Sequence, residues 1–154
     1  MSDIINFYHG NPSSSNHVLE EIWNYTLKEL EMNHDYIQWM FPLNEASKCQ
    51  PNSPVLTDED IAKFRVSRKL KLKLLRSVRV FMNFLRETID TWMVCFDHNH
   101  LRITRMLRCL VIMGLEYEAY ARLQEIRMMI VEAQEFNCPS PIAHKYWAEA
   151  LLVD

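Results

Sequence analysis

Glycine is scarce in this chain, with Gly10 and Gly114 the only two among 154 residues. Turn-rich β proteins place glycine at many of their tight turns. The glycine-rich loops that hold phosphates need several glycines within a few residues. The scarcity therefore argues against both classes. Because the apolar residues instead recur at the spacing of a helix, we predict an all-α protein.

Long apolar runs and secretory features are also missing. No stretch of about 18 consecutive apolar residues occurs, so we expect no membrane partner. The first residues, Met-Ser-Asp-Ile-Ile-Asn, lack the basic start and apolar stretch of a secretory signal. The cysteines lie far apart and form no C-x-x-C pair: Cys49, Cys95, Cys109 and Cys138. Dispersed thiols fit a reducing compartment, so we expect a cytoplasmic protein, or a nuclear one in a eukaryote.

One segment has no acidic residue. Residues 61–86 carry nine basic groups and no acid, residues 1–60 carry two basic and ten acidic groups, and the rest carries six basic and ten acidic. A helix across 63–86 would gather a basic face: Arg68, Lys69, Lys73, Arg76 and Arg79. This face could follow a nucleic-acid backbone. The acidic net charge of −3 and the lack of interleaved aromatics instead favour a solvated face, or one paired with the acidic N-terminal part.

Periodicity and capping residues predict about six helices in a single domain, 1–154, after an irregular arm at 1–15. Asn16 is the expected N-cap of the first helix, and Thr57 with Asp60 has the pattern of a capping box. The other predicted helices cover 34–40, 67–86, 100–113 and 116–136, with a last one after Pro141.

The helix predicted over 100–113 is apolar on nearly every side, so we expect it to form the centre of the core. Asn99 is its expected N-cap and Gly114 its expected C′ residue.

Polar side chains gather at the start of that central helix. They are His98, Asn99, His100, Arg102 and Arg105. In a structural interpretation, Asn99 is the cap and the arginines are buried partners of acids such as Asp35 or Asp97. Alternatively, the two imidazoles, one guanidinium and the helix N-terminus hold an anion. Because structural networks often mimic sites, the structural interpretation is favoured.

The same stretch offers metal and catalytic interpretations. Cys95, His98, His100 and His34 are potential zinc ligands, but their spacing matches no usual zinc pattern. A Cys95–His98 pair would need a geometry that closeness in sequence does not establish. We therefore expect no metal, no cofactor and no catalytic residue, and an enzyme that uses His98 or His100 is the least favoured alternative.

A second notable segment, 34–42, reads His-Asp-Tyr-Ile-Gln-Trp-Met-Phe-Pro and holds three aromatic residues. Tyrosine and tryptophan bury a large area while keeping one hydrogen-bonding group. Such clusters form cores, and peptide-binding surfaces also use them. The core interpretation is favoured, with Tyr36, Gln38 and Trp39 as the candidates for a binding surface.

These two segments carry a family resemblance. Residues 34–43 resemble the H-x-Y-I-Q-W-L-F-P-L motif of the opioid growth factor receptor N-terminal domain family. Residues 98–110, with Gly114-Leu-Glu116 after them, resemble its second signature, H-N-N-L-R-I-T-R-I-L-K-C-L followed by glycine. The family's named member is a receptor for an enkephalin peptide. The resemblance thus implies an α-helical domain that binds a peptide or partner, and it implies no reaction.

We therefore interpret the chain as a non-enzymatic binding module for a protein or peptide, with nucleic-acid association through the basic helix as the alternative. We expect the two segments to share one groove, and Asn99 and Arg105 are further candidates for binding the partner. Its expected lining is Tyr36, Gln38, Trp39, His98, His100 and Arg102.

Overall fold

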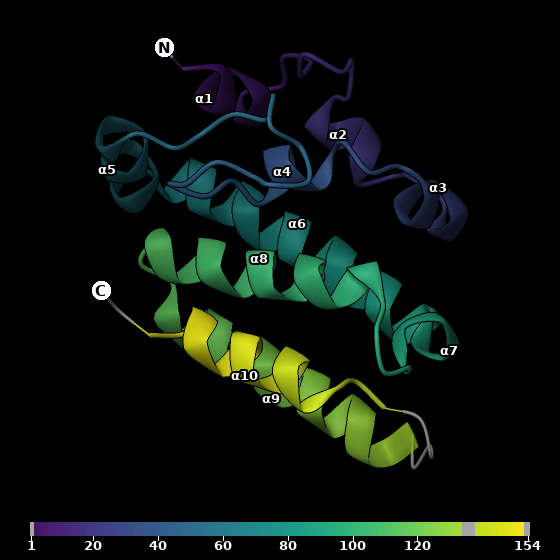
Figure 1. The fold of residues 1–154 in the computed structure, drawn as a ribbon. Helices are drawn as coiled ribbons and strands as arrows, with labels where there is room; N and C mark the ends of the chain where they lie inside the picture. Colours follow the sequence, from purple (N-terminus) through teal and green to yellow (C-terminus); the bar gives the residue numbers. More distant parts are fainter. Residues whose placement is uncertain (1, 134–137, 153–154) are drawn as a thin grey trace. The chain divides into compact units, whose positions relative to one another are not determined.

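A computed structural model describes residues 2–133 and 138–152. It divides into two compact units, Met1–Phe81 and Met82–Asp154, which are described separately. Across these described residues the regular structure consists of ten α-helices, without a strand (Figure 1). The all-α prediction is confirmed. The number of helices exceeds the expected six because five of them have only four to six residues. Helices this short show little periodicity, and only the one within 34–40 was expected as a separate helix.

The first unit contains five short helices and most of a long one. They are α1 (Asp3–Tyr8), α2 (Leu19–Ile22), α3 (Leu27–Met32), α4 (Ile37–Met40), α5 (Asp58–Val66) and α6 (Arg68–Glu87). Aromatic rings fill the core of this unit. The ring of Tyr8 lies 5.1 Å from that of Phe64, and Phe41 lies 5.8 Å from Phe81, both pairs edge to face. Such pairs stabilise a core beyond the area that they bury.

The expected irregular arm at 1–15 is wrong in its first half. Ser2 caps α1 by accepting a hydrogen bond from the backbone N–H of Ile5 at 3.2 Å. Phe7 and Tyr8 then point into the core and are fully buried. Burial of aromatic side chains stabilises a helix that is too short to be stable in isolation.

The expected first helix after Asn16 is also wrong. Asn16 has a φ of 64°, a left-handed conformation that an N-cap does not adopt. The chain instead forms α2 and α3 with a break between them. Thr26 starts α3 in a capping box, because its side chain accepts from the N–H of Glu29 and the Glu29 carboxylate accepts from the N–H of Thr26.

The two predictions for the segment 57–86 are confirmed. Thr57 and Asp60 form the expected capping box at the start of α5, with both hydrogen bonds at 3.1 Å. The long helix α6 follows, and within the first unit its apolar side buries Leu70, Leu74 and Val78.

The second unit comprises the end of α6 and four further helices: α7 (Ile89–Trp92), α8 (His98–Ile112), α9 (Glu116–Ala133) and α10 (Pro141–Ala150). Helix α8 packs against α7, α9 and α10, so it is the central helix of its unit (Figure 1). Most of its residues are buried, as expected from an apolar pattern that runs nearly all round.

The end of α8 follows the prediction, but its start does not. Gly114 has a φ of 80°, as expected for the residue that follows a helix. The N-cap is Asp97 rather than Asn99, because the Asp97 carboxylate accepts from the N–H of Asn99 at 2.8 Å. The helix therefore begins at His98, and Asn99 is buried within its first turn.

The last two helices lie close to their predicted positions. Helix α9 covers Glu116–Ala133 of the predicted 116–136, and residues 134–136 lie outside the described part. Helix α10 begins at Pro141 after the N-cap Ser140. Among the helices of the described residues, none is long and apolar enough to cross a membrane.

Candidate functional site

The start of α8 holds three buried polar side chains of the family-like segment, Asn99, His100 and Arg102. Because a carbonyl can only accept, Nε2 of His100 donates to the backbone oxygen of Trp92, at 2.8 Å. The backbone oxygen of His100 in turn accepts from Nε1 of Trp147, at 3.0 Å. These bonds join the end of α7, helix α8 and helix α10, so His100 has a structural role.

Arg102 is also inside the protein, with 5% of its surface exposed. One of its terminal nitrogens donates to the side-chain oxygen of the buried Asn99, at 3.3 Å. The structural interpretation expected both arginines to be buried; Arg102 is buried, and Arg105 is half-buried. Asp35, one of the two acids suggested as their partners, bonds to Nε2 of His17 at 2.6 Å in the first unit.

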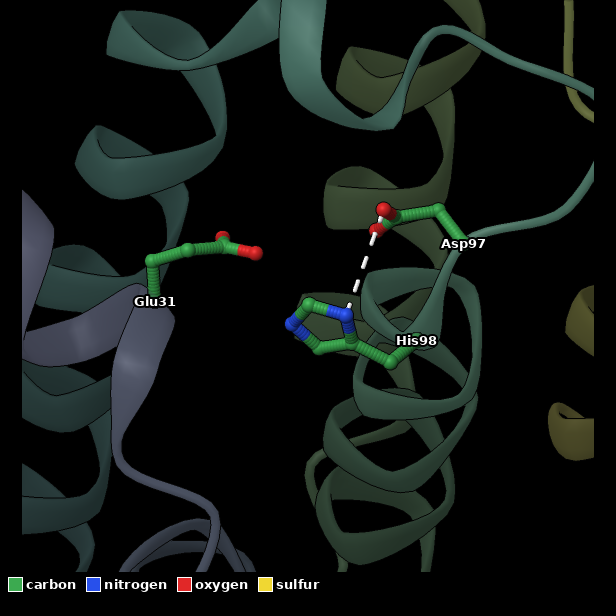
Figure 2. Close-up of side chains that lie close together, drawn as sticks. All are labelled: Glu31, Asp97 and His98. Carbon is green, nitrogen blue, oxygen red and sulfur yellow. Dashed lines mark ion pairs between the residues drawn. The ribbon is translucent and has the colours of Figure 1, made fainter.

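His98 faces outward, unlike Asn99 and His100, which follow it. Figure 2 shows its imidazole beside the Asp97 carboxylate, with 4.0 Å between Nδ1 and the nearer oxygen. The pair is ionic when the imidazole is protonated. Asp97 thus combines two roles, since it caps α8 and lies beside an exposed imidazole. Glu31, also drawn in Figure 2, belongs to the first unit.

A pocket of about 470 Å³ opens beside these residues. Its lining comes from the starts of α8 and α10: Phe96, Asp97, His98, His100, Leu101, Ser140, Ile142, Ala143 and Tyr146. Large apolar side chains are exposed in it, with Phe96 at 76% and Leu101 at 56%. Water-exposed apolar groups around a hollow are typical of a surface that binds another molecule.

Hydrogen bonds hold the two walls of this pocket together. The backbone N–H of Ser140 donates to the backbone oxygen of Cys95, at 3.1 Å. The hydroxyl of Ser140 accepts from the N–H of Ala143, at 3.3 Å, as the cap of α10. With the Trp147–His100 bond, these contacts fix both helix starts, so the pocket is largely formed before any ligand arrives.

The charge state of His144, next to this wall, is also constrained. Burial, with Arg127 and His100 nearby, lowers the pKa of His144 below its ordinary value of 6.5. Its ring lies 5.0 Å from that of Trp147. The neutral imidazole is therefore the favoured form behind the pocket.

The structure brings together only part of the predicted site. Of the five candidates on α8, His98 and His100 line the pocket, while Asn99 and Arg102 are buried. Sequence reasoning missed the apolar lining. Leu101 could have been expected at the surface, because it lies off the apolar stripe of its helix. Ile142 and Tyr146 could not have been assigned to the pocket from the sequence, because only the packing of α10 against α8 brings them there.

The candidates of the aromatic segment lie in the core of the first unit. Tyr36 is fully buried, and its hydroxyl donates to the backbone oxygen of Leu30, at 2.6 Å. Trp39 is 5% exposed and its ring lies 5.5 Å from that of Phe7, while Gln38 is 6% exposed. The favoured core interpretation agrees with this burial. The groove expected between the two segments joins residues of both units and stays a prediction.

Next to Tyr36 lies a polar cluster that sequence reasoning missed. His17 bonds to the Tyr25 hydroxyl through Nδ1 and to Asp35 through Nε2, both at 2.6 Å. Burial, followed by nearby acids, raises the pKa of Tyr25. A raised pKa makes the tyrosine a poorer nucleophile at neutral pH, so the cluster is suited to holding the segment before α2 against the two loops that flank α3.

The predicted basic face is partly occupied by contacts within the first unit. Lys73 donates to the backbone oxygen of Tyr8 at 2.7 Å and reaches Glu20 at 3.4 Å. The Arg76 guanidinium lies 4.8 Å from the ring centre of Trp23. A second pocket, of about 570 Å³, opens on this face, lined by Trp23, Arg68, Lys69, Leu72, Lys73 and Arg76. Nucleic-acid binding by this face stays a prediction.

The four cysteines are free thiols. Cys109 is buried, and burial raises its pKa to about 12, although Arg105 opposes this shift. In the described part of the second unit, Cys95, His98 and His100 do not converge as metal ligands.

Comparisons with known proteins identify the same family that the two signature segments resemble. The family described as "Opioid growth factor receptor (OGFr) conserved region" matches residues 4–137. The chain is 35% identical over 111 residues to the mouse opioid growth factor receptor, covering 61% of this chain and 17% of the receptor. It is 31% identical over 117 residues to the mouse opioid growth factor receptor-like protein 1, covering 64% of this chain and 25% of that protein. No solved structure matches.

Proposed function

Because the chain belongs to the opioid growth factor receptor conserved-region family, we propose that it is a non-enzymatic module that binds a peptide or protein partner. One similar protein is named as a receptor and the other as receptor-like, and a receptor binds a ligand. Since the matched part is no more than a quarter of these relatives, their own ligand is not transferred with the fold.

The pocket of the second unit is the observation that carries this proposal. It combines exposed apolar side chains of Phe96, Leu101 and Ile142 with the amphipathic Tyr146. Aromatic and large apolar groups of this kind dominate the centres of protein interfaces. An apolar or aromatic side chain of a partner peptide fits this lining, while His98 and Tyr146 offer polar groups at its edge.

Two peptide sources test the proposal. A random peptide library is selected on the immobilised protein, and the peptides obtained are synthesised and titrated by calorimetry. An enkephalin peptide is titrated in parallel, because the names of the relatives point to an opioid ligand. Selected peptides without enkephalin binding would support a binding module with another ligand, whereas failure to select any peptide would contradict the proposal.

Variants of the pocket locate the binding. Leu101→Glu and Ile142→Glu place a charge where an apolar side chain would be buried. We expect each to weaken binding of the selected peptide about tenfold or more, the value of one buried apolar side chain. Val131→Glu on α9 is the matched control, since Val131 is 65% exposed and outside the pocket. Equal affinities of all three variants and the wild type would remove the pocket from the proposal.

A further inference from the structure

The first unit carries a second candidate surface that the pocket of the second unit does not explain. It is the hollow of about 570 Å³ on α6, here called the α6 basic surface. Its lining is Trp23, Arg68, Lys69, Leu72, Lys73 and Arg76. We propose that this surface binds an acidic segment of a partner protein that inserts an apolar side chain between the basic groups.

The positive charge of the surface is largely unbalanced. Lys73 reaches Glu20, but among the described residues no acid pairs with Arg68, Lys69 or Arg76. The sequence explains this imbalance, because residues 61–86 contain nine basic groups and no acid. Like charges gathered on one helix face attract an oppositely charged partner and speed its association.

An apolar side chain lies in the middle of this charge. Leu72 is 54% exposed, although it lies one helical turn from Arg68, Lys69 and Arg76. Its side chain gives the basic face an apolar contact that the charged groups alone do not supply. The exposed leucine and the ring of Trp23 form an apolar floor on which an apolar side chain of the partner would be buried.

Internal contacts fix the shape of the surface. Nε1 of Trp23 donates to the Ser77 hydroxyl at 3.0 Å, which holds the indole against α6. The Arg76 guanidinium lies over that indole, and Arg76 as a whole is exposed to solvent. An arginine stacked in this way can receive a carboxylate in a two-pronged contact with less loss of side-chain freedom.

These features favour an acidic protein segment over a nucleic acid. Bases bind proteins by stacking on open aromatic rings, and here one face of Trp23 already carries a guanidinium. Phosphates gain nothing from the aliphatic side chain of Leu72. A helix with carboxylates around a central apolar residue matches both the charge and the floor.

The probe is a short synthetic helical peptide with two leucines at i and i+4 and glutamates elsewhere. We expect it to bind the full chain with an affinity that falls as salt rises. In one control peptide serine replaces leucine, and in the other glutamine replaces glutamate. Both should bind about tenfold more weakly, because the first lacks the apolar contact and the second lacks the negative charge. If the serine peptide bound as well as the parent, the surface would be a general polyanion site and the proposal would be wrong.

Matched variants locate the binding on α6. Leu72→Ser and the double variant Arg68→Gln with Lys69→Gln should each weaken the parent peptide about tenfold. Val66→Ser and Arg79→Gln are their controls, because both residues are exposed and outside the surface, and they should change the affinity less than about twofold. Unchanged binding by Leu72→Ser would overturn the proposal.

Single-stranded and duplex DNA are titrated in the same assay. If either nucleic acid bound more tightly than the peptide, and if Leu72→Ser left that binding unchanged, the proposal would be wrong. The α6 basic surface would then bind a nucleic acid rather than an acidic protein segment. This inference is independent of the proposed pocket on α8 and α10, so Leu101→Glu should leave the binding of the acidic peptide unchanged.

Discussion

The two segments that resemble the family signatures differ in how they meet solvent. In the first unit, every residue from Tyr36 to Leu43 is buried. In the second unit, the segment that starts at His98 alternates, with Asn99 and Arg102 inside and His98 and Leu101 outside. Similar-looking clusters of polar and aromatic residues can therefore serve a core in one place and border a pocket in another.

The difference arises from the length of the elements around each segment. Helix α4 is a single turn, so nearly all of its side chains must pack to hold it in place. Helix α8 has 15 residues and is held by three other helices, so a few positions in its first turn are not needed for packing. Side chains released from packing are the ones that a binding surface can use.

The largest expected effect tests whether the first segment is core. Trp39→Ala removes a ring that packs on Phe7, and we expect it to lower the free energy of unfolding by about 3–5 kcal/mol. Urea denaturation followed by circular dichroism measures this loss. Tyr117→Ala, at a side chain that is 93% exposed, is the control and should leave the urea midpoint nearly unchanged. Equal midpoints for the two variants would show that Trp39 is not core.

A smaller effect tests the buried part of the second segment. His100→Ala leaves the buried backbone oxygen of Trp92 without its donor, and we expect a loss of about 1–3 kcal/mol. His100→Gln keeps an N–H donor on a side chain of similar reach and should recover part of that loss. If His100→Ala had wild-type stability in urea, His100 would be free for ligand binding and the structural role assigned to it would be wrong.

A still smaller change in the free energy of unfolding is expected at Leu101, in the exposed part of the second segment. Leu101→Ala should change the free energy of unfolding by no more than about 0.5 kcal/mol, as is usual for a solvent-exposed side chain. The same urea titration measures it. A loss above about 1 kcal/mol would place Leu101 in the core and would remove the contrast between the two segments.

Local signals explain why parts of this fold could be predicted from the sequence. The capping box of Thr57 and Asp60, the long helix α6 and the glycine after α8 each depend on residues a few positions apart. The start of α8 was misassigned by two residues, since Asp97 and Asn99 are both good N-caps and only their backbone conformations distinguish them. Helix α1 escaped prediction because it is stabilised by burial of Phe7 and Tyr8.

The candidate site was harder to predict because its lining depends on tertiary packing. Two polar residues of the pocket, His98 and His100, were found as a dense local cluster. Ile142 and Tyr146 lie far along the chain, and the packing of α10 against α8 brings them to the same hollow. On the basic face, the charges of α6 were predicted, but the contribution of Trp23 from another helical region was not.

The smallest effect is a pH dependence in the wall behind the pocket. Burial, with Arg127 and His100 nearby, lowers the pKa of His144 below 6.5, so the folded protein favours the neutral imidazole. As the pH falls below 6.5 the unfolded chain takes up this proton first, and the contribution of neutral His144 to stability is lost as the pH reaches the lowered pKa.

Proton NMR titration of the imidazole signals measures this shift directly, with His144→Gln used to assign the resonance. We expect a midpoint below 6.5 in the folded protein and a return towards 6.5 in urea. Arg127→Gln should raise the midpoint, since it removes one of the positive charges that disfavour protonation. A midpoint at or above 6.5 in the wild type would mean that water reaches the ring, and that the wall between Trp147 and the pocket is more open than the packing of α8 and α10 indicates.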